Sequence, residues 1–186
     1  MNIIPLDGGI HNRRNFDCGE PSLNKFLQEQ AQQAAKRFGS KTVVLVDDDA
    51  NADPAIILGY HTTLISHVET AAIPEGKFGK EPVPMLLLAR IAIDRRFQGK
   101  GFGSFLLMDV LKKAKAIADA TALFGVFLDA LDDNVEKFYL KFGFKALTDK
   151  PRHLYMPIGT IVEMVKRTEA MMKESASTET PSPQES

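Results

Sequence analysis

Three glycines at alternating positions make the segment Gln98–Gly103 the part of this chain best suited to bind an anion. An apolar stretch, 86–93, ends four residues before it, and an amphipathic pattern follows it. Glycine lets the backbone turn so that successive N–H groups point to one side. The start of a helix adds unpaired N–H donors and the positive end of the helix dipole. The spacing therefore predicts a nest for a phosphate or a diphosphate.

Two common phosphate loops do not fit this segment. A P-loop needs Gly-Lys-Ser/Thr where the helix begins, but here Gly103 is followed directly by Ser104. A dinucleotide site needs Gly-x-Gly-x-x-Gly after the first strand, with an acidic residue about 20 positions further on. Here the glycines are two apart and lie late in the chain. The remaining simple alternative is that the glycines only turn the chain.

Basic side chains gather around this loop. Residues 85–115 hold seven basic residues against two acidic ones, a net charge of +5, whereas residues 159–186 have a net charge of −2. The formal net charge of the whole chain is only −1. A basic middle favours a polyanionic ligand there, and Lys100, Arg95 and Arg96 can add charge at the rim of the nest. An ordinary solvated surface is the other interpretation.

The elements that position the loop follow from hydrophobic periodicity and turn residues. Strands are expected at 42–46, 55–67, 85–93 and 122–130, with a last strand pair between 143 and 157. Helices are expected at 21–38, 104–118, 133–142 and 161–172. Mixed strands and helices of this kind predict an α/β sandwich around a mixed sheet.

Length and composition indicate one soluble domain. The chain has 186 residues, 44% of them hydrophobic and 25% charged, as in ordinary globular proteins. Its single cysteine, Cys18, excludes an internal disulfide framework and has no neighbouring thiol or histidine for a metal, so we expect a cytoplasmic protein without a metal. The apolar run 83–93 contains Arg90 and is too short to span a membrane. We expect a domain over 1–158, a helix over 159–173 and a disordered tail over 174–186.

Two motifs in this order carry a family resemblance. Gln98-Gly99-Lys100-Gly101-Phe102-Gly103 resembles the Gln/Arg-x-x-Gly-x-Gly/Ala signature of the GNAT superfamily of N-acetyltransferases. Phe138-Tyr139-Leu140-Lys141-Phe142-Gly143-Phe144 resembles the tyrosine helix and Gly-Phe turn of the same family. The resemblance covers about residues 1–158. The two motifs in this order are much more specific for the family than either motif alone.

The resemblance implies a fold and a set of roles. The fold would be GNAT-like, with a mostly antiparallel sheet, flanking helices and a splayed central strand pair. Acetyl-CoA would be the co-substrate, and Tyr139 the general acid that protonates the departing thiolate, because the pKa of a phenol, about 10, lies near that of a thiol. The N–H near Ile91 would polarise the thioester carbonyl. The implied cofactor-binding residues are Ile91, Ala92 and Ile93 along the pantetheine arm, Gln98, Gly99, Lys100, Gly101, Phe102 and Gly103 at the diphosphate, and Asp132.

Two parts of the implied site are weaker. Asp132 stands where many relatives have an asparagine that touches the cofactor, and Asn134 lies two residues further on. No side chain stands out as the base that would deprotonate the amine. The candidates are His61, His67, Glu20 and Glu69, and a water relay is an equal alternative.

The amino-terminal third is similar to one branch of the family. The segment Phe16–Leu27, together with residues 88–94, resembles the toxin-type GNATs of bacterial toxin–antitoxin modules. That resemblance implies acetylation of the α-amino group of aminoacyl-tRNA, which blocks translation, and silencing by a ribbon–helix–helix antitoxin. A tRNA needs a basic surface, for which the candidates are Arg13, Arg14, Lys36, Arg37, Arg90, Arg95 and Arg96.

Two other functions stay open. The chain would act as a housekeeping GNAT if its acceptor were a small amine or a peptide or protein amine. It would be a non-catalytic module if it only sensed acetyl-CoA for a partner. A homodimer is also expected from the resemblance, and the apolar stripe of the helix 161–172 would serve such a contact or pack on the chain's own core.

Overall fold

A single mixed sheet organises the chain in the computed structural model, which describes residues 1–49, 53, 55–74 and 81–178. Its strands are β1 (Asn2–Pro5), β2 (Lys41–Val46), β3 (Gly59–Val68), β4 (Val83–Ile93), β5 (Gly125–Asp129), β6 (Lys145–Ala146) and β7 (His153–Pro157). They lie in the order β1-β2-β3-β4-β5-β7-β6. Only the β4–β5 pair is parallel, and the other neighbours are antiparallel. The predicted fold class, a mixed and mostly antiparallel sheet flanked by helices, is confirmed.

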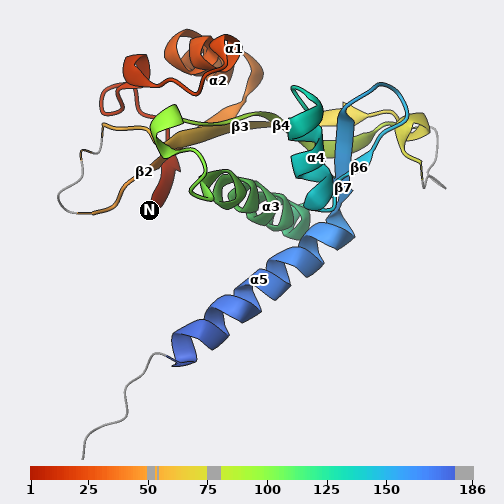
Figure 1. The fold of residues 1–186 in the computed structure, drawn as a ribbon. Helices are drawn as coiled ribbons and strands as arrows, with labels where there is room; N and C mark the ends of the chain where they lie inside the picture. The colour runs from red at the N-terminus through yellow and green to blue at the C-terminus, as the bar shows by residue number, and fades with distance from the viewer. Residues whose placement is uncertain (50–52, 54, 75–80, 179–186) are drawn as a thin grey trace, which may run out of the picture.

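Helices cover both faces of this sheet (Figure 1). They are α1 (Pro21–Lys25), the π-helical segment η2 (Phe26–Gln30), α2 (Ala31–Phe38), α3 (Phe102–Ala120), α4 (Asp133–Lys141) and α5 (Ile158–Thr178), with short 3-10 turns at Arg13–Asn15, Thr70–Ala72 and Arg95–Phe97. Phe26, Leu27 and Ala31 pack with β2 and β3 residues on one face. Leu107, Leu111 and Tyr139 share a core cluster with β4 and β5 on the opposite face. The helices that belong to the two sequence motifs, α3 and α4, therefore lie in one layer.

The amino-terminal helix is not the continuous α-helix that periodicity predicts for 21–38. Glu20 caps its start by accepting a hydrogen bond from the backbone N–H of Ser22, and Gly39 ends it with φ of 66°. Between them, the N–H of Ala31 donates to the carbonyl of Phe26, one residue further back than in an α-helix. Apolar periodicity does not reveal this π segment, because Ala31 lies four residues after Leu27 and five after Phe26, spacings that fit an α-helical and a π-helical turn respectively. Such segments are frequent at functional sites.

The sheet opens between β4 and β5. Their pairing is limited to Leu86 with Val126 and Leu87 with Phe127, so in the described chain the rest of β4 pairs only with β3. The β3–β4 register also shifts between Thr62, opposite Arg90, and Thr63, opposite Leu88, which leaves Ala89 as a bulge. Bulges re-aim side chains and raise the local twist. The expected splayed strand pair is confirmed, and the bulge lies where the splay begins.

Two strands begin later than predicted. β3 starts at Gly59 rather than at residue 55, because residues 55–58 turn back and the N–H of Ile56 donates to the carbonyl of Asp53. β5 starts at Gly125 rather than at residue 122. The N–H of Phe124 donates to the carbonyl of Pro84, and its carbonyl accepts from the N–H of Ile158. β-Branched and apolar content alone does not distinguish the residues that lead into a strand from those of the strand itself.

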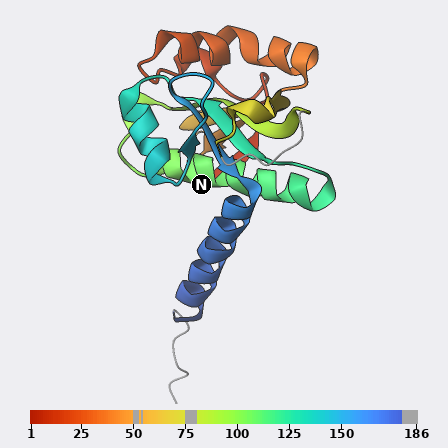
Figure 2. The ribbon, with the colours of Figure 1, turned by 90° about the vertical axis from the view of Figure 1, so that its right-hand side faces the viewer.

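The carboxy-terminal helix α5 is longer than predicted at both ends. Ile161 and Val165 are fully buried against α3, while the second half of α5 projects away from the body (Figures 1 and 2). It continues through Thr178, so Glu174–Thr178 is helical and the predicted tail boundary at residue 174 is wrong; residues 179–186 of that prediction lie outside the described residues. No glycine or proline stops the helix between Lys173 and Thr178. None of the described helices is long and apolar enough to cross a membrane.

Candidate active site at the splayed strands

The loop after β4 has an open, concave side. Gly99 and Gly101 adopt φ of 76° and 83°, in the left-handed region that favours glycine. Gly101 is the N-cap of α3, and its first turn receives no side-chain cap from the described residues. A Cβ added at Gly99, Gly101 or Gly103 would meet no described atom within 4 Å. The free N–H groups of the first turn therefore face open space, as an anion nest requires.

A pocket of about 290 Å³, which we call the loop pocket, lies against these amides. Besides the glycine loop, its wall includes Ile93 at the end of β4, Phe97 and, from α4, Phe138. Phe138 of the second sequence motif thus meets the glycine loop in one cavity, whereas its neighbour Tyr139 does not line that cavity. Because a side chain would fill the space that the glycines leave, the residues present fit a diphosphate with an elongated arm beside β4.

Side chains around the loop hold it in place. The Gln98 side chain donates to the backbone carbonyls of Cys18 and Ile93, both at 2.9 Å. It therefore anchors the loop to the segment before α1, a role that the sequence did not suggest. Asp94 is buried and accepts from the backbone N–H of Arg96 at 3.0 Å and from its guanidinium at 2.8 and 2.9 Å. Burial opposes ionisation of Asp94, but these hydrogen bonds outweigh it and lower its pKa.

Tyr139 lies on α4 at the edge of the α3–α4 core. It is 3% exposed and makes edge-on contacts with the rings of Phe138 and Phe144. Burial raises the pKa of its hydroxyl well above the usual value. Among the described residues none forms a hydrogen bond with that hydroxyl, which stays protonated and uncommitted. A buried phenol of this kind can donate a proton to a sulfur atom that becomes charged beside it.

The predicted pantetheine-binding residues occupy the free part of β4. Ile91, Ala92 and Ile93 pair with β3 on one edge, and their other edge faces the gap to β5. Ile91 and Ile93 pack toward α3, whereas Ala92 is buried under the α1–α2 layer. Their unpaired backbone edge is the one that the predicted contact with an extended arm requires.

A second pocket, which we call the α2 pocket, lies on the other face of β4. Its volume is about 210 Å³, and it is lined by Phe26, Ala34, Phe38, Ser40, Thr62, Leu64, Leu87, Ala89 and Arg90. The bulge at Ala89 explains this composition, because Leu88 and Ile91 belong to the α3 face while Ala89 and Arg90 both line the α2 pocket. The Arg90 guanidinium lies 3.9 Å from the ring centroid of Phe26, a cation–π contact.

The basic candidates do not form one cluster. Arg90 lines the α2 pocket, and the Arg37 guanidinium lies 5.1 Å from the ring centroid of Phe38 at the rim. Lys36 is exposed in the same last turn of α2. Arg95 pairs with Asp17 at 3.4 Å and Arg96 with Asp94, so part of their charge is neutralised. Arg13 and Arg14 lie in the 3-10 turn before α1 and line neither of these two pockets.

Asp132 acts as the N-cap of α4. Its carboxylate accepts hydrogen bonds from the backbone N–H groups of Asn134 and Val135 at 2.8 and 2.9 Å. This structural role accounts for the aspartate without a cofactor. Contact between Asp132 and the cofactor stays a prediction.

The candidate bases are engaged or distant. His61 is fully buried on the α3 side, where its Nε2 lies 2.7 Å from Asp109, and burial lowers its pKa. Glu20 caps α1, and His67 and Glu69 are exposed near the far end of β3. None of the four lines the loop pocket or the α2 pocket. Among the described residues no group of three or more His, Cys, Asp or Glu could hold a metal ion.

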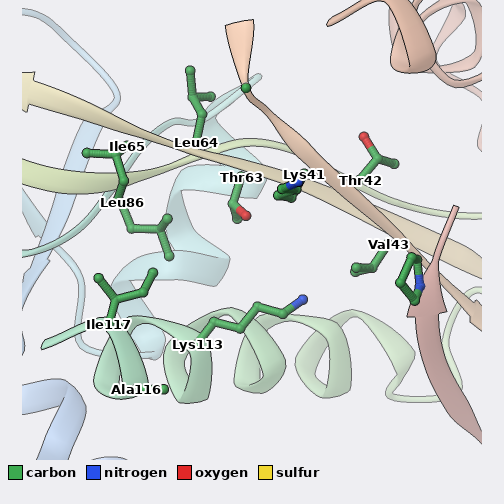
Figure 3. A pocket seen from close by; sticks show the side chains of 12 residues that line it. Lys41, Thr42, Val43, Thr63, Leu64, Ile65, Leu86, Lys113, Ala116 and Ile117 are labelled. Atoms are coloured by element: carbon green, nitrogen blue, oxygen red, sulfur yellow. The ribbon is translucent and has the colours of Figure 1, made fainter. Parts of the chain in front are cut away.

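A larger cavity, the α3 pocket, lies on the same side as His61. Its volume is about 470 Å³ between β2, β3 and the second half of α3 (Figure 3). Lys113 points into it from α3 (Figure 3) and pairs with Asp109 at 2.8 Å. It contains neither the glycine loop nor Tyr139, so size alone would have indicated the wrong cavity.

Sequence reasoning missed most of the α2 pocket. Of its lining, only Arg90 was a candidate site residue. Phe26, Ala34 and Leu64 carry the same apolar signal as core residues, and only the π segment and the bulge turn them toward a cavity. The one available signal was a charged residue, Arg90, within an otherwise apolar strand.

The fold and this site define an acetyltransferase. Residues 23–144 match the model of the Acetyltransferase (GNAT) family, which is more than half of the chain. The chain therefore belongs to the GNAT family.

Comparison with individual proteins places it near one branch of that family. It is 32% identical to a "tRNA-acetylating toxin" of Mycobacterium tuberculosis, over 76% of this chain and 83% of that protein. The structure of AtaT complexed with acetyl-methionyl-tRNAfMet is 27% identical, with a TM-score of 0.79 over 88% of this chain and 98% of that one. A mutant AtaT toxin bound to the C-terminus of the antitoxin AtaR and acetyl-CoA is 25% identical, with a TM-score of 0.73 over 88% and 96%.

Proposed function

We propose that this chain is a toxin of a toxin–antitoxin module that transfers an acetyl group from acetyl-CoA to the α-amino group of aminoacyl-tRNA. The observation that carries this proposal is that two pockets lie on opposite sides of β4, where β4 separates from β5. The loop pocket and Tyr139 lie on one side of β4, and a pocket with an arginine lies on the other. The 32% identity to a tRNA-acetylating toxin supports the choice of acceptor.

Acetyl-CoA supplies an activated acetyl thioester when it is bound. The backbone N–H groups of the glycine loop and of the first turn of α3 would hold its diphosphate, with Lys100 nearby. The free edge of Ile91–Ile93 would align its arm, and a backbone N–H of β4 near Ile91 would stabilise negative charge on the acetyl oxygen. Except for the Ile93 carbonyl, which accepts from the Gln98 side chain, the backbone groups on this edge are left without partners by the described residues.

Tyr139 holds the proton that the sulfur needs. Burial raises its pKa, so the hydroxyl stays protonated at neutral pH. The same desolvation disfavours a thiolate, and a proton from Tyr139 relieves that charge. The α-amino group of an aminoacyl ester, with an ordinary pKa of about 8, is neutral in part near pH 7.5. It needs only a water molecule to remove its second proton.

The proposal includes a partner and a compartment. A ribbon–helix–helix antitoxin would bind and silence the enzyme, in keeping with the structure of AtaT bound to the C-terminus of AtaR. The substrate places its action in the cytoplasm.

Expression of the chain without an antitoxin tests the proposal. We expect growth arrest, together with a mass increase of one acetyl group on the amino acid of aminoacyl-tRNA from the arrested cells. The Tyr139→Phe variant serves as the control and should permit growth. Unhindered growth without the acetyl mark, combined with turnover of polyamines or free amino acids by the purified enzyme, would establish the housekeeping alternative.

A further inference from the structure

We infer that the α2 pocket binds the side chain of the aminoacyl group, and that it selects uncharged, apolar side chains, up to about the size of phenylalanine, over glycine and over charged side chains. The inference rests on the proposed function and deepens it, because neither the fold nor the glycine loop determines which amino acid is acetylated.

The α2 pocket lies beside the gap between β4 and β5. Leu87 is the last β4 residue that pairs with β5, and Leu87, Ala89 and Arg90 form one wall of the α2 pocket. The strand that borders the acetyl-binding gap is thus also the wall of the pocket. Tyr139 lies in the core of the opposite face. An amine held at the mouth of the α2 pocket would approach the gap from the side opposite the proton donor.

The size of the pocket restricts its occupant. Its volume of about 210 Å³ is below the roughly 300–1,000 Å³ of pockets for drug-sized ligands. It is still many times the volume that one water molecule needs. At about 30 Å³ for each heavy atom, the share of one water molecule in the liquid, such a space holds one side chain of up to roughly seven heavy atoms, the size of phenylalanine. Glycine would leave most of it unfilled.

The lining determines the chemistry. Phe26, Ala34 and Leu64 offer hydrocarbon surface, and none of the described residues in the wall is acidic. A lysyl or arginyl side chain would meet Arg90 and find no carboxylate. The hydroxyl of Thr62 is taken by Thr42 at 2.9 Å. The buried hydroxyl of Ser40 has no hydrogen-bond partner among the described residues and is an uncharged group in the wall.

Arg90 and Phe38, at the rim of the α2 pocket, contact a different part of the acceptor from the interior of the pocket. The guanidinium is held over Phe26 and carries no carboxylate partner within the described chain. The acceptor always has a phosphodiester a few ångströms from its ester, whichever amino acid it carries. Phe38, 63% exposed at the mouth, offers a face on which a terminal base can stack. We therefore assign Arg90 to the terminal phosphate and the interior of the pocket to the side chain.

The test measures kcat/KM for purified enzyme on tRNAs charged with methionine, leucine, glycine, aspartate or lysine. We expect values at least about tenfold higher for the two apolar residues, since burying or losing a methylene or two changes such ratios by roughly 10–200-fold. The Ala34→Phe variant fills the pocket from α2. It should lower kcat/KM for leucyl- and methionyl-tRNA about tenfold or more and leave glycyl-tRNA within about threefold.

Matched variants separate selection from misfolding. Ala116→Phe makes the same change on α3, in the α3 pocket, and should leave the preference unchanged. Leu64 lines both the α2 pocket and the α3 pocket. Leu64→Ala enlarges the α2 pocket by three carbon atoms and should raise kcat/KM for tryptophanyl-tRNA relative to methionyl-tRNA, which tests the idea even if Ala34→Phe does not fold.

The outcomes distinguish this inference from the function beneath it. Acetylation of aspartyl-, lysyl- or glycyl-tRNA as fast as methionyl- or leucyl-tRNA would overturn the inference and leave the proposed function standing. An equal loss on all five substrates in Ala34→Phe would overturn it as well. Acetylation of no aminoacyl-tRNA by the wild type would refute both.

Discussion

At the scale of single residues, the surroundings of the Tyr139 hydroxyl support its proposed role as a proton donor. The ring of Tyr139 packs against Phe138 and Phe144, and none of the described residues forms a hydrogen bond with its hydroxyl. Packing therefore does not require this oxygen, which leaves it available as a proton donor.

We therefore predict that Tyr139→Phe lowers kcat by about 10²–10⁴, the usual contribution of a general acid, while the Kd for acetyl-CoA changes less than about twofold. Its Tm should not fall, because the substitution removes no hydrogen bond within the protein. Steady-state kinetics, calorimetric titration and thermal melting measure the three quantities.

The control for this variant is Tyr60→Phe. The Tyr60 hydroxyl donates to the carbonyl of Leu23 at 2.8 Å, so its removal should cost about 1 kcal/mol of stability and change kcat only a few-fold. Equal losses of turnover and affinity in Tyr139→Phe would contradict the role assigned to the phenol.

Individual residues also show how far a sequence can be interpreted. The glycine loop was recognisable because its φ angles are a property of glycine itself. The side chains of Gln98 and Asp132 were not, since a glutamine beside a nest or an aspartate before a helix serves equally well as ligand, anchor or cap. Only their hydrogen bonds, to Cys18 and Ile93 for Gln98 and to the start of α4 for Asp132, decide between these roles.

At the scale of elements, the start of α3 must both bind an anion and begin a stable helix. An anion site needs an uncapped helix start, and an uncapped start lowers helix stability. A negative side chain there would satisfy the helix and occupy the site.

We predict that Gly103→Glu maintains or raises Tm and abolishes acetyl-CoA binding. Gly103 has no positive φ, and a Cβ there meets no described atom within 4 Å. The substitution therefore adds no strain, favours the helix by up to about 1 kcal/mol, and brings negative charge to the diphosphate site. Melting curves and calorimetry report the two effects. Gly159→Glu, the same change in the first turn of α5, should bind acetyl-CoA normally; binding by Gly103→Glu would disprove the nest.

The pair of β3 and α3 has a pH-dependent contact. His61 is buried with its Nε2 against Asp109, and the Nζ of Lys113 lies 3.4 Å from the same nitrogen. Burial lowers the pKa of His61 and outweighs the hydrogen bond to Asp109, which raises it, while the charge of Lys113 lowers it further. Burial opposes ionisation of Asp109, but hydrogen bonds from His61 and Lys113 outweigh it and lower its pKa. The folded protein thus holds a neutral histidine beside a carboxylate.

We predict that stability falls as pH decreases below about 6.5, because the unfolded chain then binds a proton that folded His61 resists. One such proton changes the free energy of unfolding by at most about 1.4 kcal/mol per pH unit. Urea unfolding between pH 7.5 and 5.5 should show a shallower loss in His61→Gln than in the wild type. Identical slopes would mean that His61 does not cause the loss.

At the scale of the whole molecule, the distribution of charge over the two faces says more about a polyanionic partner than the net charge does. The net charge of −1 does not favour a polyanion. The exposed Lys36 and Arg37 nevertheless lie at the end of α2 beside the mouth of the α2 pocket, and Lys112 is exposed on α3, on the other side of the sheet. An acceptor with a long phosphate backbone would contact the first group and not the second.

We predict that Lys36→Glu and Arg37→Glu each raise the Kd for aminoacyl-tRNA several-fold and reduce its dependence on log salt by about one unit for each phosphate that the variant no longer neutralises. Aminoacyl-adenosine, which lacks the backbone, should be acetylated by Lys36→Glu at the wild-type rate, because Lys36 lines neither pocket. Lys112→Glu makes the same change of charge on the opposite face and should leave the Kd and the salt slope as they are. If all three variants weakened tRNA binding alike, net charge rather than the α2 face would determine the interaction, and the orientation of the acceptor proposed above would be wrong.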